Sequence, residues 1–168
     1  MANEIKMPGT PPDWLNGLMA VMLRTPLVQR LVGKTFALLT VTGAKTGRRY
    51  TIPVQYLRHE GEVVVLSQRM RKWWRNIAER PEVDVRIEGE AMHGHGRIAS
   101  DDEARSVLSD CLRDEPRVAK FYGLAPNDDG VIEMQGVNRL LEQVTVIVVT
   151  PQPIEVELEP ADVVMEGF

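Results

Sequence analysis

The stretch "TGAKTGRRYTIPVQYLRHEGEVVVLSQ", residues 42–68, contains a glycine-bounded turn followed by two segments rich in β-branched and aromatic residues. Gly43 and Gly47 bound the turn, because glycine adopts the backbone conformations that a tight reversal needs. The segments Tyr50–Arg58 and Glu62–Ser67 alternate like strands, and the short "HEGE" between them predicts a β-hairpin. A turn followed by two strands in immediate succession favours antiparallel pairing.

The rest of the chain extends this pattern of successive strands. Phe36–Thr42 is a short apolar strand, "VDVRIEG" and "AMHGHGRIA" are two alternating strands joined at Gly89, and "QVTVIVVTP" is a strongly β-branched last strand. Helices are predicted over Arg71–Glu79, stopped by Pro81, and from Asp101 to about Arg113, while "YGLAPNDDG" is a loop followed by a weakly helical stretch. This order predicts a mainly β (α+β) fold, a split β-barrel of about six antiparallel strands with covering helices, rather than a doubly wound parallel sheet. Six barrel residues are expected to be buried: Val63, Val65, Val83, Val85, Ile147 and Val149.

Length and composition predict one domain. At 168 residues and 43% hydrophobic content, the chain suffices for a single well-buried core. Residues 1–12 form a Pro/Gly-rich arm, and residues 13–168 are predicted to form one domain that begins with a helix over 13–32. That helix is interpreted as a lid over one end of the barrel, with weak peripheral membrane contact as the alternative. No apolar run is long enough for an integral membrane segment, and a cytoplasmic location is expected.

Charge is distributed unevenly along the chain. The net charge of −4 argues against nucleic-acid binding. Between residues 45 and 75, however, lie eight of the 20 lysines and arginines and only two of the 24 acidic residues. Glycines, hydroxyl groups and two tryptophans accompany these cations, so the segment suits an anionic, planar ligand better than a solvated surface alone.

Several other kinds of site have weak support. "GAKTG" differs from a phosphate-binding P-loop, because its lysine precedes the second glycine and a strand follows. His93 and His95 share a strand face, but no third ligand is evident, so no metal is predicted. The single cysteine, Cys111, is most simply a small core residue on an amphipathic helix, and one cysteine indicates a reducing compartment.

Three blocks in order carry a family resemblance. "LLTVTGAKTGRRYTIPV" (38–54) is followed by "VVVLSQ" (63–68) and "WWRNIAERPEVDV" (73–85). Together they resemble the deazaflavin-dependent nitroreductase family of the flavin/deazaflavin oxidoreductase superfamily, split β-barrel proteins that use reduced coenzyme F420. Two positions depart from that family's pattern: Tyr50 stands in place of a basic residue, and Gln68 in place of a lysine. Nearby arginines are candidates to replace the missing charges.

The resemblance implies a cofactor site at these blocks. Lys45, Thr46 and Gly47 would bind the phosphate or acidic tail of the cofactor, Ile52 and Pro53 would lie against its ring, and Ser67 would donate to phosphate. Asn76 would offer a donor and an acceptor to the cofactor, and at least one of Trp73 and Trp74 is expected to serve in ordinary packing. The full predicted set is Lys45, Thr46, Gly47, Arg48, Arg49, Tyr50, Ile52, Pro53, Ser67, Gln68, Arg69, Arg71, Lys72, Trp73, Trp74 and Asn76.

The implied activity is hydride transfer from reduced F420 to a small electrophilic acceptor such as a quinone, an enone or a nitro compound. Tyr56, Tyr122 and His95 are the candidate proton or hydrogen-bond donors. The alternative is a split-barrel protein that binds FMN, haem or a related cofactor, with or without turnover. The expected partners are therefore small molecules, and both a monomer and a homodimer remain open.

Overall fold

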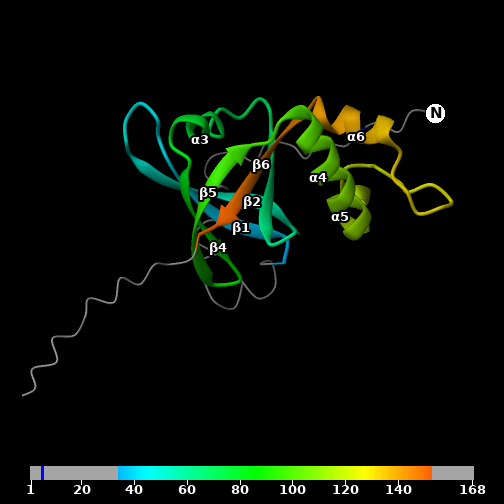
Figure 1. The fold of residues 1–168 in the computed structure, drawn as a ribbon, viewed down its shortest axis with the longest axis horizontal. Coiled ribbons are helices and arrows are strands. Elements are labelled where there is room, and N and C mark those ends of the chain that lie inside the picture. The colour runs from blue at the N-terminus through cyan, green and yellow to red at the C-terminus, as the bar shows by residue number, and fades with distance from the viewer. Residues whose placement is uncertain (1–4, 6–33, 153–168) are drawn as a thin grey trace, which may run out of the picture.

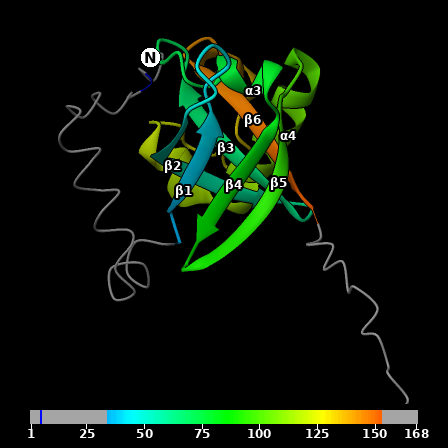
Figure 2. The same ribbon diagram turned by 90° about the vertical axis from the view of Figure 1, so that its left-hand side faces the viewer.

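The structure, a computed structural model, describes Ile5 and residues 34–152, and within them six antiparallel strands close into a barrel (Figures 1 and 2). Around the barrel the order is β1-β2-β3-β6-β5-β4. The strands are β1 (Phe36–Thr42), β2 (Arg49–His59), β3 (Glu62–Gln68), β4 (Glu82–Ile87), β5 (Glu90–Ile98) and β6 (Val144–Pro151). The predicted barrel of about six strands is confirmed. The predicted helix over 13–32 and the arm over 1–12, Ile5 apart, lie outside the described residues, and the single domain stays a prediction.

Four helices accompany the strands in the described part of the chain: α3 (Arg75–Glu79), α4 (Asp101–Asp114), α5 (Pro116–Phe121) and α6 (Met134–Leu141). Helix α4 matches its prediction, and the Ser100 side chain caps it by accepting a hydrogen bond from the Glu103 N–H. Helix α3 begins at Arg75 rather than Arg71, because residues 71–72 have no regular structure and residues 73–74 form a turn. Helix α5 was not predicted, since Pro116 suggests a break although proline fits a first helical position.

The inside of the barrel is one apolar core. Side chains alternate along each strand, and every second one points inward. The six residues predicted to be buried are 0% or 1% exposed, which confirms that prediction. They belong to a cluster that also includes Leu39, Tyr56 and Ile77 of α3.

A second core lies outside the barrel, where α4, α5 and α6 cover β3 and β6 (Figure 1). Val64 and Leu66 of β3, and Val146 and Val148 of β6, face these helices while their neighbours face the barrel interior. Both faces of these two strands are therefore buried. This explains why "VVVL" (63–66) and "VIVV" (146–149) are continuous apolar runs rather than alternating ones.

The two ends of the barrel are connected differently. At one end, two-residue turns join β2 to β3 at Glu60–Gly61 and β4 to β5 at Glu88–Gly89, and all four residues have positive φ. At the other end lie the three longer connections: residues 43–48, residues 69–81 with α3, and residues 99–143 with α4, α5 and α6. We call these the hairpin end and the loop end.

Candidate functional site

The turn over residues 43–48 lies at the loop end and closes on itself. The Gly43 N–H donates to the Arg48 carbonyl and the Gly47 N–H to the Gly43 carbonyl, each at 2.9 Å. Gly47 has φ of +66°, which favours glycine, and a Cβ on Gly43 would stand 2.9 Å from Thr46 Oγ1. Thr46 Oγ1 also accepts from the Arg48 N–H at 3.3 Å. Lys45 and Thr46 are thereby presented to solvent at the tip.

Asn76 on α3 ties this turn to the barrel. Its Oδ1 accepts from the Ala44 N–H at 2.9 Å, and its Nδ2 donates to the Tyr50 hydroxyl and, at 2.9 Å, to the Trp73 carbonyl. The two amide hydrogens and the carbonyl oxygen are thus engaged within the protein. Asn76 therefore holds the turn, β2 and α3 together, whereas the sequence suggested that it would contact the cofactor itself. Burial raises the pKa of Tyr50, against the effect of its bond to Asn76.

The predicted basic residues divide into two groups. Arg49 forms an ion pair with Asp84 on the outer surface, and Arg69 Nε donates to the carbonyls of Leu141 and Val144 at 3.0 and 3.2 Å. Within the described part of the chain, four others form no ion pair: Lys45, Arg48, Arg71 and Lys72. Three of these four are exposed and Arg71 is half-buried. The turn over residues 43–48 and residues 71–72, before α3, therefore present unpaired cations at the same end of the barrel.

A small polar group closes the barrel interior at this end. Ser67 and its register partner Thr145 are buried, at 4% and 8% exposed, and both continue the inward-facing rows of β3 and β6. Ser67 Oγ donates to the Gln68 carbonyl at 3.4 Å. Sequence analysis did not select Thr145, because a threonine among valines in a strand is ordinary, and only the pairing of β3 with β6 identifies it.

The residues expected to flank the cofactor ring do not share a surface. Ile52 is the register partner of Leu39 and packs toward the barrel interior, while Pro53 is the partner of Leu38 on the outer face. Adjacent strand residues point to opposite faces, so a single ring cannot lie on both side chains from one side. Trp73 and Trp74 both pack against the barrel core, as expected for at least one of them.

The three candidate donors are separated in the structure. Tyr56 lies inside the barrel toward the hairpin end, and burial raises its pKa. The Tyr122 hydroxyl donates to Gln55 Oε1 at 2.9 Å beneath the helices, where burial raises its pKa to about 12. His95 is on the outer surface, 3.4 Å from Glu82 Oε1. None of the three is brought to the turn.

The histidines and the cysteine have structural partners. His93 lies between carboxylates, with Nδ1 2.7 Å from Asp84 Oδ1 and Nε2 2.9 Å from Glu82 Oε2. A search of the described residues finds no group of His, Cys, Asp or Glu arranged to hold a metal ion. Cys111 is buried in the outer core, which confirms its packing role, and burial raises the pKa of its thiol to about 12.

Comparison with known proteins gives the family. Residues 19–121, more than half of the chain, match the F420H(2)-dependent quinone reductase family. The chain belongs to this family. This confirms the resemblance carried by the three sequence blocks; the protein is an F420H2-dependent oxidoreductase and coenzyme F420 is its cofactor. None of the helices described here is long and apolar enough to cross a membrane.

Solved structures show the same fold. A protein described as a domain-swapped dimer is 16% identical, with a TM-score of 0.50 over 83% of this chain and 99% of its own. HutZ, the haem storage protein of Vibrio cholerae, is 12% identical, with a TM-score of 0.51 over 77% of this chain and 91% of its own. An F420-H2 dependent reductase, FDR-A, is 18% identical, with a TM-score of 0.49 over 69% of this chain and 94% of its own. At these identities, the first two likenesses show the split-barrel fold and nothing about ligands.

The residues present at the loop end fit an acidic, phosphate-bearing cofactor. The turn offers a glycine-bounded backbone whose Gly43 has no room for a side chain, and it carries two of the four unpaired cations, while the other two lie just before α3. Trp74 Nε1 is a buried donor for which no acceptor is found among the described residues. In the two connections over residues 43–48 and 69–81, lysines and arginines outnumber acidic residues, as an anionic ligand requires.

Proposed function

We propose that the protein transfers a hydride from reduced F420 to a small electrophilic acceptor, such as a quinone, an enone or a nitro compound, at the loop end of the barrel. The observation that carries this proposal is the set of four cations without an ion pair at one end of the barrel: Lys45 and Arg48 lie in the turn, and Arg71 and Lys72 lie just before α3, which Asn76 bonds to the turn. Family membership supplies the cofactor. The residues that hold it, and the class of acceptor, are the proposed part.

The turn over residues 43–48 and residues 71–72, before α3, would hold the phosphate and the acidic tail of F420. Lys45, Thr46 and the backbone of Gly47 would contact the tail, because ammonium, hydroxyl and exposed N–H groups all favour anionic oxygens. Arg71 and Lys72 would contribute from the opposite side of the turn. Since Lys45, Arg48 and Lys72 are exposed, their attraction to the cofactor should weaken as salt concentration rises.

The remaining task of the protein is to orient the ring and exclude water. When bound, reduced F420 supplies a hydride and a proton, which together convert a quinone into its hydroquinone and leave oxidised F420. Trp73, Ser67 and Gln68 lie at the same end and would border the ring. Asn76 acts through others: it fixes the position of Ala44 and Tyr50 relative to α3, so that the turn and the helix keep one geometry.

One experiment tests the cofactor and the acceptor together. Purified protein is titrated in parallel with F420H2, FMNH2 and haem, and oxidation is then followed with menadione, an enone and a nitroimidazole as acceptors. We expect tight binding of F420H2 alone and turnover with at least one acceptor. Binding of FMN or haem in place of F420H2, or F420H2 binding with none of the acceptors reduced, would contradict the proposal.

A further inference from the structure

The hydrogen-bonded ladder between β2 and β3 stops partway along both strands. From their turn at the hairpin end, the two strands pair as far as Tyr56 and Val65. Beyond that point β2 pairs with β1 as far as Arg49, and β3 pairs with β6 as far as Gln68. We call residues 49–55 of β2 and 66–68 of β3 the divergent section. Within the described residues, no ladder fixes the spacing of the two strands there.

The two sides of the divergent section carry different parts of the proposed site. The turn over residues 43–48, which would hold the acidic tail of F420, leads directly into β2. Ser67 and Gln68, which would border the ring, are the last residues of β3. The spacing between β2 and β3 therefore determines where the border of the ring lies relative to the tail.

Asn76 holds the divergent section at the loop end. Its amide bonds to Tyr50 of β2 and to Ala44 of the turn, and it belongs to α3, in the connection that follows β3. This bond network joins the two sides at one point. A second connection is needed to fix the angle between the strands.

A hydrogen bond holds the other end of the divergent section. The Tyr122 hydroxyl donates to Gln55 Oε1 at 2.9 Å, and Gln55 is the residue of β2 directly beyond the last pair with β3. The Gln55 side chain lies on the outer face of the barrel, because the neighbouring Tyr56 faces the interior and strand residues alternate.

Tyr122 connects this bond to β3. Tyr122 is 4% exposed and belongs to the outer core, in which the helices pack on Val64 and Leu66 of β3. Its ring also meets Phe121 edge to face, with the ring centroids 5.2 Å apart. The hydroxyl therefore reaches from the layer that covers β3 to Gln55 on β2. The bond joins the two strands at the point where their ladder ends.

We propose that Gln55 and Tyr122 are positioning residues for hydride transfer: their hydrogen bond sets the spacing of β2 and β3 in the divergent section, and with it the placement of the F420 ring relative to the acceptor. The inference rests on the proposed function and makes it more specific. The sequence suggested Tyr122 as a donor to the substrate, whereas in this role it acts through β2.

The first test removes the hydrogen bond and keeps the packing. Tyr122→Phe deletes the hydroxyl, and Gln55→Met replaces the amide by an apolar chain of similar length. With saturating F420H2 and the acceptor that wild type reduces fastest, each variant should lower kcat about ten- to hundredfold, since misplacement by about 1 Å has effects of this size. F420 affinity should stay at the wild-type value, because the cations that would hold the tail are unchanged.

Three further variants show whether the effect follows the bond. The double variant Tyr122→Phe/Gln55→Met should be no slower than the slower single variant, because both changes remove the same interaction. Gln55→Glu keeps an acceptor oxygen for Tyr122 and should recover most of the lost kcat. Asn138→Ala is the matched control: it removes the 3.2 Å bond from Arg105 Nε, which joins α4 to α6 without reaching β2, and should leave kcat unchanged.

Thermal unfolding separates positioning from stability, and wild-type activity separates this inference from the proposed function. If Tyr122→Phe and Gln55→Met unfold at lower temperature but keep the wild-type kcat, the bond is structural only; the positioning role is then wrong and the hydride-transfer proposal stands. Equal losses in Gln55→Glu and Gln55→Met would also contradict the positioning role. If wild type binds F420H2 and reduces no acceptor, the proposed function is wrong, and this inference is wrong with it.

Discussion

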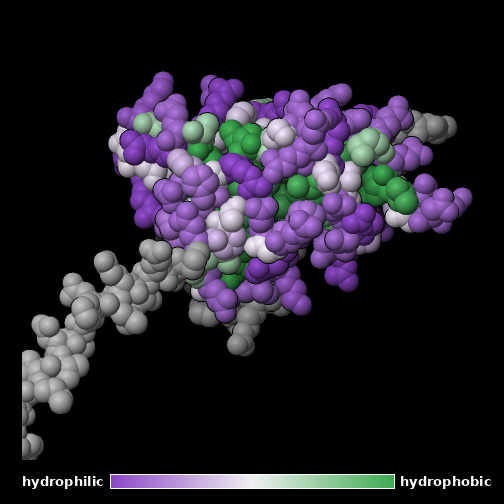
Figure 3. Space-filling view, viewed as in Figure 1, coloured by the Kyte–Doolittle hydropathy of each residue, from purple (hydrophilic) through white to green (hydrophobic). Residues whose placement is uncertain are grey.

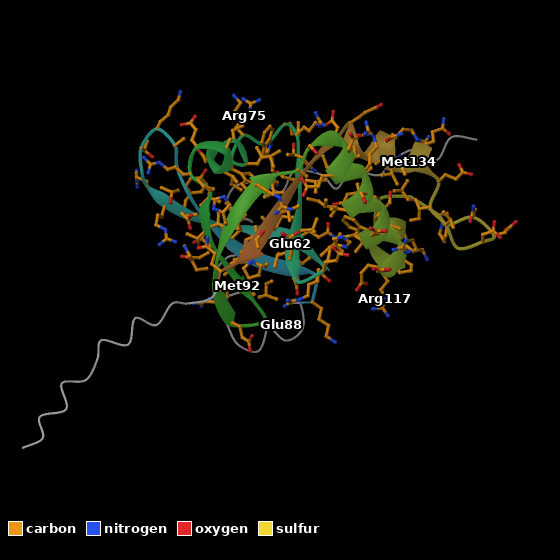
Figure 4. The ribbon with its side chains drawn as sticks, viewed as in Figure 1. Glu62, Arg75, Glu88, Met92, Arg117 and Met134 are labelled. Carbon is orange, nitrogen blue, oxygen red and sulfur yellow. The ribbon has the colours of Figure 1, made fainter. Side chains whose placement is uncertain are left out.

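The hairpin end and the loop end of the barrel are built from the same strands and serve different purposes. At the hairpin end, two-residue turns at Glu60–Gly61 and Glu88–Gly89 join the strands directly. At the loop end, the connections carry the four unpaired cations, Trp73, Trp74 and α3. In Figure 4, Arg75 and Glu88 mark these opposite ends. The short turns of the hairpin end close the barrel, and the longer connections of the loop end can vary without disturbing it.

The same contrast appears on the surface. The face shown in Figure 3, which includes β5, β6 and α4, is largely hydrophilic with a few hydrophobic patches. On that face, Arg97 joins Glu62 of β3, at 3.0 Å, to Glu103 of α4, at 2.6 Å. Arg97 is therefore paired, and it joins α4 to the barrel. At the loop end, Lys45, Arg48, Arg71 and Lys72 form no ion pair with described residues, which is unfavourable for stability and favourable for binding an anion.

The largest effect expected is on the packing of α3. Ile77, 1% exposed, is the one buried residue of α3, and Ile77→Ala should lower the free energy of unfolding by about 2–5 kcal/mol. Because α3 holds the turn through Asn76, F420 affinity should fall as well. Ile87, which is 2% exposed and lies at the hairpin end, provides the matched control. Ile87→Ala should cause a similar loss of stability and leave the affinity for F420 unchanged. Urea unfolding and F420 titration of both variants decide this, and equal F420 affinities in the two would remove the distinction between the ends.

The next largest effect is expected on F420 affinity when a positive charge is removed from the turn. Lys45→Ala should weaken F420 binding by about 1.5–3 kcal/mol, the range for a hydrogen bond to a charged group. The free energy of unfolding should not change, since Lys45 is exposed and makes no ion pair with described residues. Arg117→Ala, which removes an exposed cation from α5 (Figure 4), should leave F420 affinity unaltered. A wild-type affinity in Lys45→Ala, measured by fluorescence at low and high salt, would exclude Lys45 from the site.

Sequence patterns predicted the barrel better than the site. The six strands follow from alternation, from the glycine turns and from β-branched runs, all of which are local signals. The site depends on which residues meet in space. The predicted contact of Asn76 with the cofactor stays a prediction. The sequence did not show that its amide bonds to Ala44, Tyr50 and Trp73, contacts that span as many as 32 positions in sequence.

Strand faces account for other differences. Ile52 and Pro53 are neighbours in sequence and were expected to line one ring, yet the strand places them on opposite faces. Arg49 was placed in the predicted cofactor-binding set, and Asp84, which pairs with it, lies on another strand, 35 positions away in the sequence. Tyr56, Tyr122 and His95 were chosen by chemistry alone, and the closure of the barrel distributes them over its interior, its helix-covered face and its outer surface.

Two glycines offer a finer comparison of the ends. Gly47 and Gly61 have φ of +66° and +82°, and a Cβ on either would meet nothing within 4 Å. Alanine at either position should therefore cost only backbone strain, about 1–2 kcal/mol. Gly61→Ala should leave F420 affinity intact, whereas Gly47→Ala should weaken it, because the turn backbone faces the proposed tail. Urea midpoints and F420 titrations measure both, and a Gly47→Ala variant with unchanged affinity would separate the turn backbone from the cofactor.

The smallest effect expected is a pH dependence of the free energy of unfolding. It arises on the outer face of β4 and β5, between the two ends of the barrel. The pKa of His93 is raised above 6.5, chiefly by its hydrogen bond to Asp84 and secondarily by that to Glu82. Two neighbours face the same carboxylates: Arg49 neutralises part of the Asp84 charge, and His95 also contacts Glu82. Because the folded protein binds this proton more tightly, the stabilisation is fully present below the unfolded-state pKa of about 6.5 and is lost as pH rises through the higher folded-state value.

His93 is 46% exposed, so water screens these interactions and the contribution should be no more than roughly 0.2–1 kcal/mol. Urea unfolding of wild type and His93→Gln at about pH 6 and about pH 8.5 measures it as the difference between the two proteins at each pH. We expect wild type to be the more stable at the lower pH and the difference to shrink at the higher one, with F420 affinity equal in both proteins throughout. A difference that stays constant with pH would show that His93 contributes packing rather than charge, and one that grows with pH would show that its folded-state pKa is lowered instead.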